Sequence, residues 1–110
     1  MELNQISAVI ICCNEEAKIE RALKSLQGIV DETVIVDSGS RDRTIDICRR
    51  YTDRIYHKEW EGYRRQKEFA TNQARNDWIL SVDADEAVSP ELHSEVSRWR
   101  CIVPANYAGY

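Results

Sequence analysis

Four short strand-like segments alternate with stretches of helical periodicity, and this alternation constrains the fold most strongly. Three of the segments are apolar runs rich in β-branched residues, which indicates strands buried on both faces; the third in chain order alternates and fits a more exposed strand. With short connections, this order predicts an α/β fold: a Rossmann-like parallel sheet of about four strands with helices on both faces. The expected strands cover residues 6–13, 33–36, 54–60 and 78–82, and the expected helices 15–26, 42–51 and 63–75.

Cap and stop residues mark several of the expected helix ends. Asn14 is expected to cap the first helix, and Gly28 to follow its end. Ser89 followed by Pro90 predicts one more helix, with serine as the cap and proline at the first helical position.

Composition narrows the class of protein. The 110 residues suit one domain, and 43% hydrophobic with 31% charged residues is typical of a soluble globular protein. A net charge of −4 argues against nucleic acid as a partner. The start lacks the pattern of a signal peptide and no apolar run could span a bilayer, so we expect a cytoplasmic protein, with contact to the inner membrane face left open. The four cysteines are expected to be free thiols.

Polar residues follow three of the predicted strands where each strand ends. In an open parallel sheet, ligands bind beyond the carboxyl ends of the strands, so these residues should converge on one rim. They are Asn14 and Glu15 after the first strand, Asp37 and Ser38 after the second, and Asp83, Asp85 and Glu86 after the fourth.

The pair Asp83 and Asp85 predicts a cation site. Side-chain direction repeats every two residues along an extended segment, so both carboxylates should lie on one side and repel each other unless a cation neutralises them. Oxygen ligands of this kind suit Mg²⁺ or Mn²⁺. The alternative is an exposed acidic turn before a helix, whose N-terminus favours negative charge.

Other features leave alternatives open. No dinucleotide-binding or P-loop glycine motif occurs. Arg64, Arg65 and Lys67 could reach a diphosphate across the rim, although a solvated helix face is the ordinary explanation of such a run. We interpret the three tryptophans as core or interface residues and not as a stacking platform; they are Trp60, Trp78 and Trp99.

Four motifs in order resemble glycosyltransferase family two, which has the GT-A fold. They are "AVIICCNEE", "VIVDSGSRDRT", "EWEGYRRQKEFA" and "NDWILSVDADE", and the resemblance covers residues 7–88. The third and fourth motifs are similar to those of a bacterial subgroup that adds sugars to the lipopolysaccharide inner core. The resemblance implies that this part is the N-terminal, donor-binding half of such an enzyme.

The resemblance also implies the chemistry. It implies an inverting transfer, with a hexose moved from a nucleotide-sugar donor, often UDP-linked, to a lipopolysaccharide-core or other glycan acceptor, with Mn²⁺ or Mg²⁺. By position, Glu15 and Asp37 would contact the nucleoside, Lys67 the base or diphosphate, Asp83 the ribose or a metal-bound water, and Asp85 the metal. With the other rim residues, the predicted nucleotide-binding set is Asn14, Glu15, Asp37, Ser38, Lys67 and Asp83, and the predicted metal ligands are Asp85 and Asp83.

The family's acceptor site and general base lie beyond the matched motifs. We therefore expect residues 1–110 to be a single truncated domain, with no catalytic base assigned. One alternative is a nucleotide- and metal-binding module without catalysis, which would associate with itself or a partner through an exposed apolar face. A phosphatase of the haloacid dehalogenase type is a third reading, disfavoured because its D-x-D follows the first strand.

Overall fold

The protein forms one α/β sheet domain in the computed structural model, which describes the backbone of residues 5–102 and the side chains of residues 5–98. Strands and helices alternate along the whole of this range, as the sequence predicts. Within the described range, none of the helices has the length and apolar character needed to cross a membrane. The elements are β1 (Ile6–Cys12), α1 (Ile19–Ser25), β2 (Glu32–Asp37), α2 (Thr44–Cys48), β3 (Ile55–His57), α3 (Tyr63–Gln73), β4 (Trp78–Asp83) and α4 (Pro90–Ile102).

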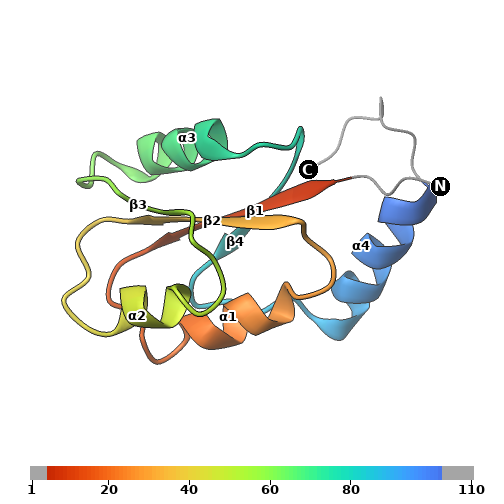
Figure 1. Ribbon diagram of the computed structural model, residues 1–110, viewed down its shortest axis with the longest axis horizontal. Helices are drawn as coiled ribbons and strands as arrows, with labels where there is room; N and C mark the ends of the chain where they lie inside the picture. Colours follow the sequence, from red (N-terminus) through yellow and green to blue (C-terminus); the bar gives the residue numbers. More distant parts are fainter. Residues whose placement is uncertain (1–4, 103–110) are drawn as a thin grey trace.

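The four described strands form one parallel sheet in the order β3-β2-β1-β4 (Figure 1). β1 lies at its centre and pairs with β2 on one side and with β4 on the other; Val9, for example, lies between Val34 and Ser81. Every carboxyl end therefore points to the same rim, which confirms the predicted α/β class and the parallel sheet.

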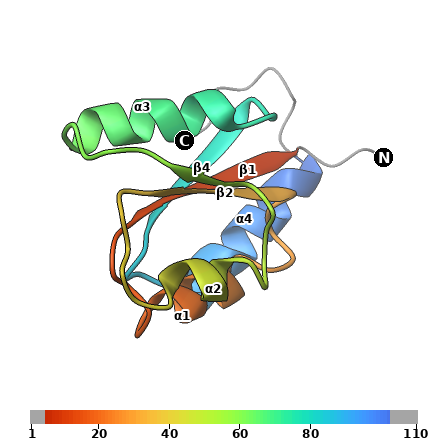
Figure 2. The ribbon, with the colours of Figure 1, turned by 60° about the vertical axis from the view of Figure 1, so that its left-hand side comes forward.

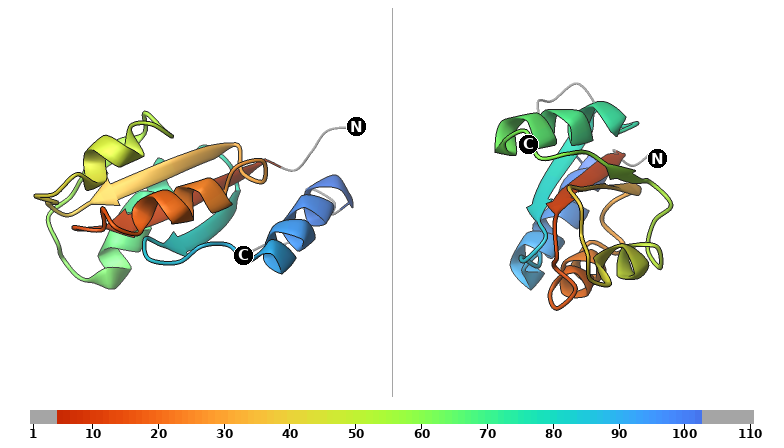
Figure 3. Two further views of the ribbon diagram at one scale, coloured as in Figure 1. Left: turned by 90° about the horizontal axis from the view of Figure 1, so that it is seen from below. Right: turned by 90° about the vertical axis from the view of Figure 1, so that its left-hand side faces the viewer.

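Helices cover both faces of the sheet, as predicted. α3 lies alone over one face, and α1, α2 and α4 lie over the other (Figures 1 and 2). The right-hand view of Figure 3 shows the strands between α3 and the α1–α2 pair. α4 belongs to the α1 face because Leu92 and Val96 join the same core cluster as Trp78 and Leu80 of β4.

The core is divided by the two faces of β1. Ile6, Ala8 and Ile10 face α1 in the larger cluster, whereas Val9 faces α3 and packs with Ala70. Every residue of β1 except Ile11 is buried, which explains why the strand is a continuous apolar run with no polar alternation.

The first helix begins later than predicted, and Asn14 does not cap it. α1 starts at Ile19, and Asn14 has a left-handed backbone with φ of 53°. Its side-chain oxygen accepts a hydrogen bond from the Arg41 amide at 2.7 Å. The expected cap is wrong because a contact with a distant loop replaces the local one.

Other boundaries shift less. α2 is shorter than the predicted 42–51, and β3 covers only three of the predicted residues 54–60. β3 stops early because the amide of Lys58 makes the last bond to β2, at the Asp37 carbonyl, before the chain turns away. The predicted start of α4 is confirmed: Ser89 Oγ accepts a hydrogen bond from the Leu92 amide at 3.1 Å.

A polar network closes the end of the sheet opposite the rim. Glu32 accepts hydrogen bonds of 2.5 Å from Ser7 Oγ, from the Arg75 amide and from Arg54 Nη1. Arg54 also donates to the Gln73 carbonyl, so the network joins β1 and β2 to the end of α3. Burial by itself would raise the pKa of Glu32, but the hydrogen bonds from Ser7, Arg75 and Arg54 outweigh it and hold the pKa below the usual 4.5.

Replacing Glu32 by glutamine should lower the free energy of unfolding by about 2 kcal/mol at pH 7, because a nearly buried Arg54 loses its charged acceptor. Because the pKa of Glu32 is lowered on folding, its contribution is present above 4.5 and lost as the pH falls through the folded-state value. Urea unfolding of both proteins across this range measures the difference, which should shrink in acid.

Glu68→Gln is the matched control. Glu68 pairs with Arg64 at 3.0 Å, but both side chains are exposed, so its loss should change stability by less than about 0.5 kcal/mol. Equal effects of the two substitutions would contradict a special role of the Glu32 network.

Candidate functional site

A cavity of about 600 Å³ opens at the rim formed by the carboxyl ends of the strands. It lies where the ends of β1 and β2 meet the turn after β4 and the segment that enters α3. Both apolar and acidic side chains face it. The residues that line it are Ile11, Cys12, Cys13, Glu15, Ser38, Trp60, Tyr63, Asp83, Ala84 and Asp85.

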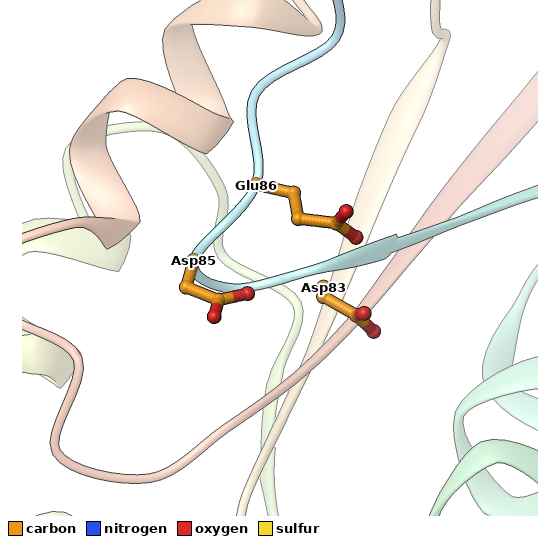
Figure 4. Close-up of side chains that lie close together, drawn as sticks. All are labelled: Asp83, Asp85 and Glu86. Carbon is orange, nitrogen blue, oxygen red and sulfur yellow. The ribbon is translucent and has the colours of Figure 1, made fainter.

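Three carboxylates gather beside this cavity, at the last residue of β4 and in the turn that follows it (Figure 4). One oxygen from each of Asp83, Asp85 and Glu86 lies within 4.8 Å of the others. Ala84 is buried in the core and anchors the turn, which leaves its two aspartate neighbours on the outside. The Glu86 amide donates to the Asp83 carbonyl at 3.0 Å and closes the turn.

The negative charges of these three carboxylates repel one another. The pKa of Glu86 is raised, first by its hydrogen bond with Asp83, then by the charge of Asp83, by desolvation and by the charge of Asp85, while Lys67 opposes the change. A carboxyl group whose pKa is raised by its neighbours releases its proton when a divalent cation binds and replaces that proton. The all-oxygen donor set fits Mg²⁺ or Mn²⁺.

Tyr63, the first residue of α3, reaches the acidic cluster. Its hydroxyl donates a hydrogen bond to Asp83 Oδ1 at 2.7 Å. The ammonium of Lys67 lies 4.8 Å from the centre of the Tyr63 ring, one turn further along the helix. This chain of contacts brings Lys67 to the acidic side of the cavity, although Lys67 itself is not part of the lining.

Two aromatic residues of the lining were not predicted as site residues. Trp60 is 56% exposed and Tyr63 is 50% exposed, and they are the large hydrophobic residues exposed within the described range. Trp60 is therefore not a core residue, and of the two predicted alternatives only an interface position is compatible with its exposure. The buried Trp78 agrees with the prediction, and the side chain of Trp99 lies outside the described residues.

Asp37 organises its own loop. The side chain is buried, and its Oδ2 accepts hydrogen bonds from the amides of Gly39 at 2.9 Å and Ser40 at 2.7 Å. Its Oδ1 accepts from the hydroxyl of Ser40 and from the thiol of Cys12. Asp37 thus lies beneath the rim, while its neighbour Ser38 reaches the cavity.

Side chains of the β2–α2 loop hold the β1–α1 loop in place. The Asn14 amide donates to Ser40 Oγ at 2.8 Å, and the Glu15 amide donates to Thr44 Oγ1 at 2.8 Å. The Glu16 amide donates to Asp42 Oδ2 at 3.2 Å. Three backbone donors are thereby satisfied by a loop about 26 residues away, which fixes Glu15 at the cavity.

The structure brings four of the predicted site residues together and leaves three aside. Glu15, Ser38, Asp83 and Asp85 line the cavity, whereas Asn14, Asp37 and Lys67 do not. Arg64 and Arg65 pair with acidic residues of their own helix region, Glu68 and Glu61, as on a solvated helix face. Cys12, Cys13 and Cys48 are free thiols as predicted, and the side chain of Cys101 lies outside the described residues.

Several known proteins are similar to this chain in sequence. An uncharacterized glycosyltransferase of Rickettsia bellii (strain RML369-C) is 48% identical over 92 residues, which are 84% of this chain and 31% of that protein. The lipopolysaccharide core biosynthesis glycosyltransferase LpsC of Rhizobium meliloti (strain 1021) is 38% identical, over 96% of this chain and 44% of its own length.

A solved structure has the same fold. Glucosyl-3-phosphoglycerate synthase from Mycobacterium tuberculosis, in complex with UDP, superposes with a TM-score of 0.65 and 27% identity. The match covers 76% of this chain and 34% of that one.

The family described as "Glycosyl transferase family 2" matches residues 7–99. The chain spans about a third of the length of its Rickettsia relatives. The observed strand order and the acidic turn at the rim are consistent with membership of this family. The chain belongs to glycosyl transferase family 2.

Proposed function

We propose that this chain is the donor-binding part, about residues 7–88, of an inverting glycosyltransferase that uses a nucleotide-sugar donor and Mn²⁺ or Mg²⁺. The observation that carries the proposal is the position of the carboxylate cluster on the same cavity as the ends of β1 and β2. A donor of this class needs a cation beside its diphosphate and a surface for its nucleoside, and the cavity offers candidates for both.

The acidic turn is the part of the cavity proposed to hold the metal. Asp85 is proposed as a direct ligand, and Asp83 as a second ligand or a partner of the ribose. Asp83 ends β4 and Asp85 lies in the turn that follows. Both carboxylates are exposed, so they are accessible to a ligand without rearrangement of the core. When bound, the cation supplies positive charge that stabilises the leaving diphosphate.

The ends of β1 and β2 are proposed to hold the nucleoside. Glu15 and Ser38 line the cavity there and offer acceptor and donor groups. Asn14 and Asp37 fix the two loops that carry these residues, because their side chains accept hydrogen bonds from amides of the β2–α2 loop. Lys67 approaches the acidic side, where its ammonium would offset the charge of a diphosphate.

The relatives support a proposal for the donor and for the acceptor. The Mycobacterium tuberculosis synthase, of the same fold, has been crystallised with Mn²⁺ and UDP, at 25% identity to this chain, which supports a UDP-linked sugar. The name of the Rhizobium relative supports a lipopolysaccharide-core acceptor. The general base and the acceptor site are not assigned to residues of this chain. A module that binds nucleotide and metal without transfer is the second candidate, because the acidic cluster beside the cavity would suit binding alone as well.

Replacing Asp85 by asparagine should weaken Mn²⁺-dependent binding of UDP at least about tenfold, because a proposed direct ligand loses its charge. Calorimetric titration of UDP into the purified chain, with and without Mn²⁺, measures this loss. Asp46→Asn, which removes an exposed carboxylate of α2, is the matched control and should bind like the wild type. Unchanged binding by the Asp85 variant would contradict the proposed metal ligand.

Binding of UDP with Mn²⁺ should change the fluorescence of Trp60, because this exposed side chain lines the cavity whereas Trp78 is buried. We expect the emission change and the protection from acrylamide quenching to disappear in Trp60→Phe, whose UDP affinity is measured in parallel by calorimetry. A full emission change in this variant would show that the ligand binds away from the cavity.

Affinity for Mn²⁺ should rise with pH in the window just above 4.5, because the raised pKa of Glu86 keeps a proton in the cluster there. Ionisation of Glu86 in that window also removes stability from the metal-free fold, since a carboxyl with a raised folded-state pKa favours the folded state in its protonated form. Metal titrations at several pH values measure the slope. In Glu86→Gln the slope over this window should flatten, and an identical slope would contradict the assignment to Glu86.

A further inference from the structure

We propose that Tyr63 is a positioning residue that orients Asp83 for the cation. This inference rests on the proposed function, because it assigns a role at the same acidic turn. Its basis is the hydrogen bond of 2.7 Å from the Tyr63 hydroxyl to Asp83 Oδ1. The bond links the first residue of α3 to the last residue of β4, two elements that come from separate parts of the chain.

The hydrogen bond from Tyr63 is made to one oxygen of Asp83. Oδ1 accepts from the Tyr63 hydroxyl, and Glu86 shares a hydrogen bond with the same carboxyl group inside the acidic cluster. A hydrogen bond to one oxygen restricts the rotation of a carboxylate, which favours one orientation of the group toward a cation. Hydrogen-bonded partners of metal ligands act in this way, and their loss usually weakens metal binding 10-fold to 100-fold.

Tyr63 is itself held by its surroundings. Gly62 precedes it with φ of 105°, a left-handed conformation that glycine adopts without strain, and the chain turns there into α3. The amide of Gln66 bonds to the Gly62 carbonyl at 3.1 Å and closes the first helical turn. Gln66 is fully buried and its Nε2 donates to the Lys58 carbonyl at 3.2 Å, which ties the helix start to the end of β3.

The exposure of Tyr63 distinguishes its proposed role at the acidic turn from a purely structural role in the core. Half of Tyr63 is exposed, so the residue buries little apolar area for its size. The ring has Lys67 on one face and borders the cavity, and the hydroxyl is directed at the acidic cluster. An aromatic residue in this position serves the site more than the core.

The test is the Mn²⁺ affinity of Tyr63→Phe in the presence of UDP, followed by the electron paramagnetic resonance signal of free Mn²⁺. Phenylalanine keeps the ring and its contact with Lys67 but removes the hydroxyl. We expect a loss of about 10-fold or more in Mn²⁺ affinity. The affinity for UDP without metal should stay the same, because only the orientation of Asp83 toward the cation is altered.

Tyr51→Phe is the matched control. The Tyr51 hydroxyl donates to Glu20 Oε2 at 2.9 Å, so the substitution removes the same kind of hydrogen bond away from the rim. It should leave Mn²⁺ affinity unchanged, and thermal unfolding of both variants compares their effects on the fold.

Three results would overturn the inference. If Tyr63→Phe binds Mn²⁺ as tightly as the wild type, the proposed function stands and the role of Tyr63 fails. If both tyrosine variants lose affinity in proportion to stability, Tyr63 supports only the fold. If the folded wild type binds no Mn²⁺ with UDP, the proposed function fails, and the inference fails with it.

Discussion

Parallel pairing of β1 with both of its neighbours is the constraint on which the site depends. The register places Cys12 opposite Asp37 and Ile11 opposite Asp83, so the acidic ends of β2 and β4 flank the end of β1. A slip of one residue would turn Val9 and Ile10 to the wrong faces, and the two different cores on these faces would oppose it. The packing that stabilises the fold therefore also fixes the distance between the two acidic loops.

Polar residues at the rim divide into those that build the loops and those that face the cavity. The side chains of Asp37 and Asn14 accept hydrogen bonds from backbone amides of the β2–α2 loop. Glu15 and Ser38, one position further along the chain in each case, are left beside the cavity. A loop whose amides are already satisfied loses little conformational freedom on binding a ligand, which favours affinity. This arrangement explains why so many polar residues follow such apolar strands.

Much of this structure could be predicted from the sequence, for reasons that are local. Buried strands such as β1 are continuous runs of apolar residues, and the carboxyl ends of parallel strands must share a rim. The conformation of Asn14 could not be predicted, because its partner, the Arg41 amide, is 27 residues away. The position of Trp60 and Tyr63 at the cavity was missed for a related reason: aromatic residues are usually expected in a core, and the cavity exists only where their segment meets the ends of distant strands.

The central claim is that the rim of the sheet binds a cation together with a nucleoside diphosphate. Its most direct test is paramagnetic broadening of backbone amide signals by Mn²⁺ in the presence of UDP, measured by nuclear magnetic resonance on the assigned chain. If the claim holds, broadening begins at residues 83–86 and extends to residues 13–15, while signals around Glu32 and Arg54 at the opposite end stay sharp. Broadening centred elsewhere, or none in the folded protein, would contradict it.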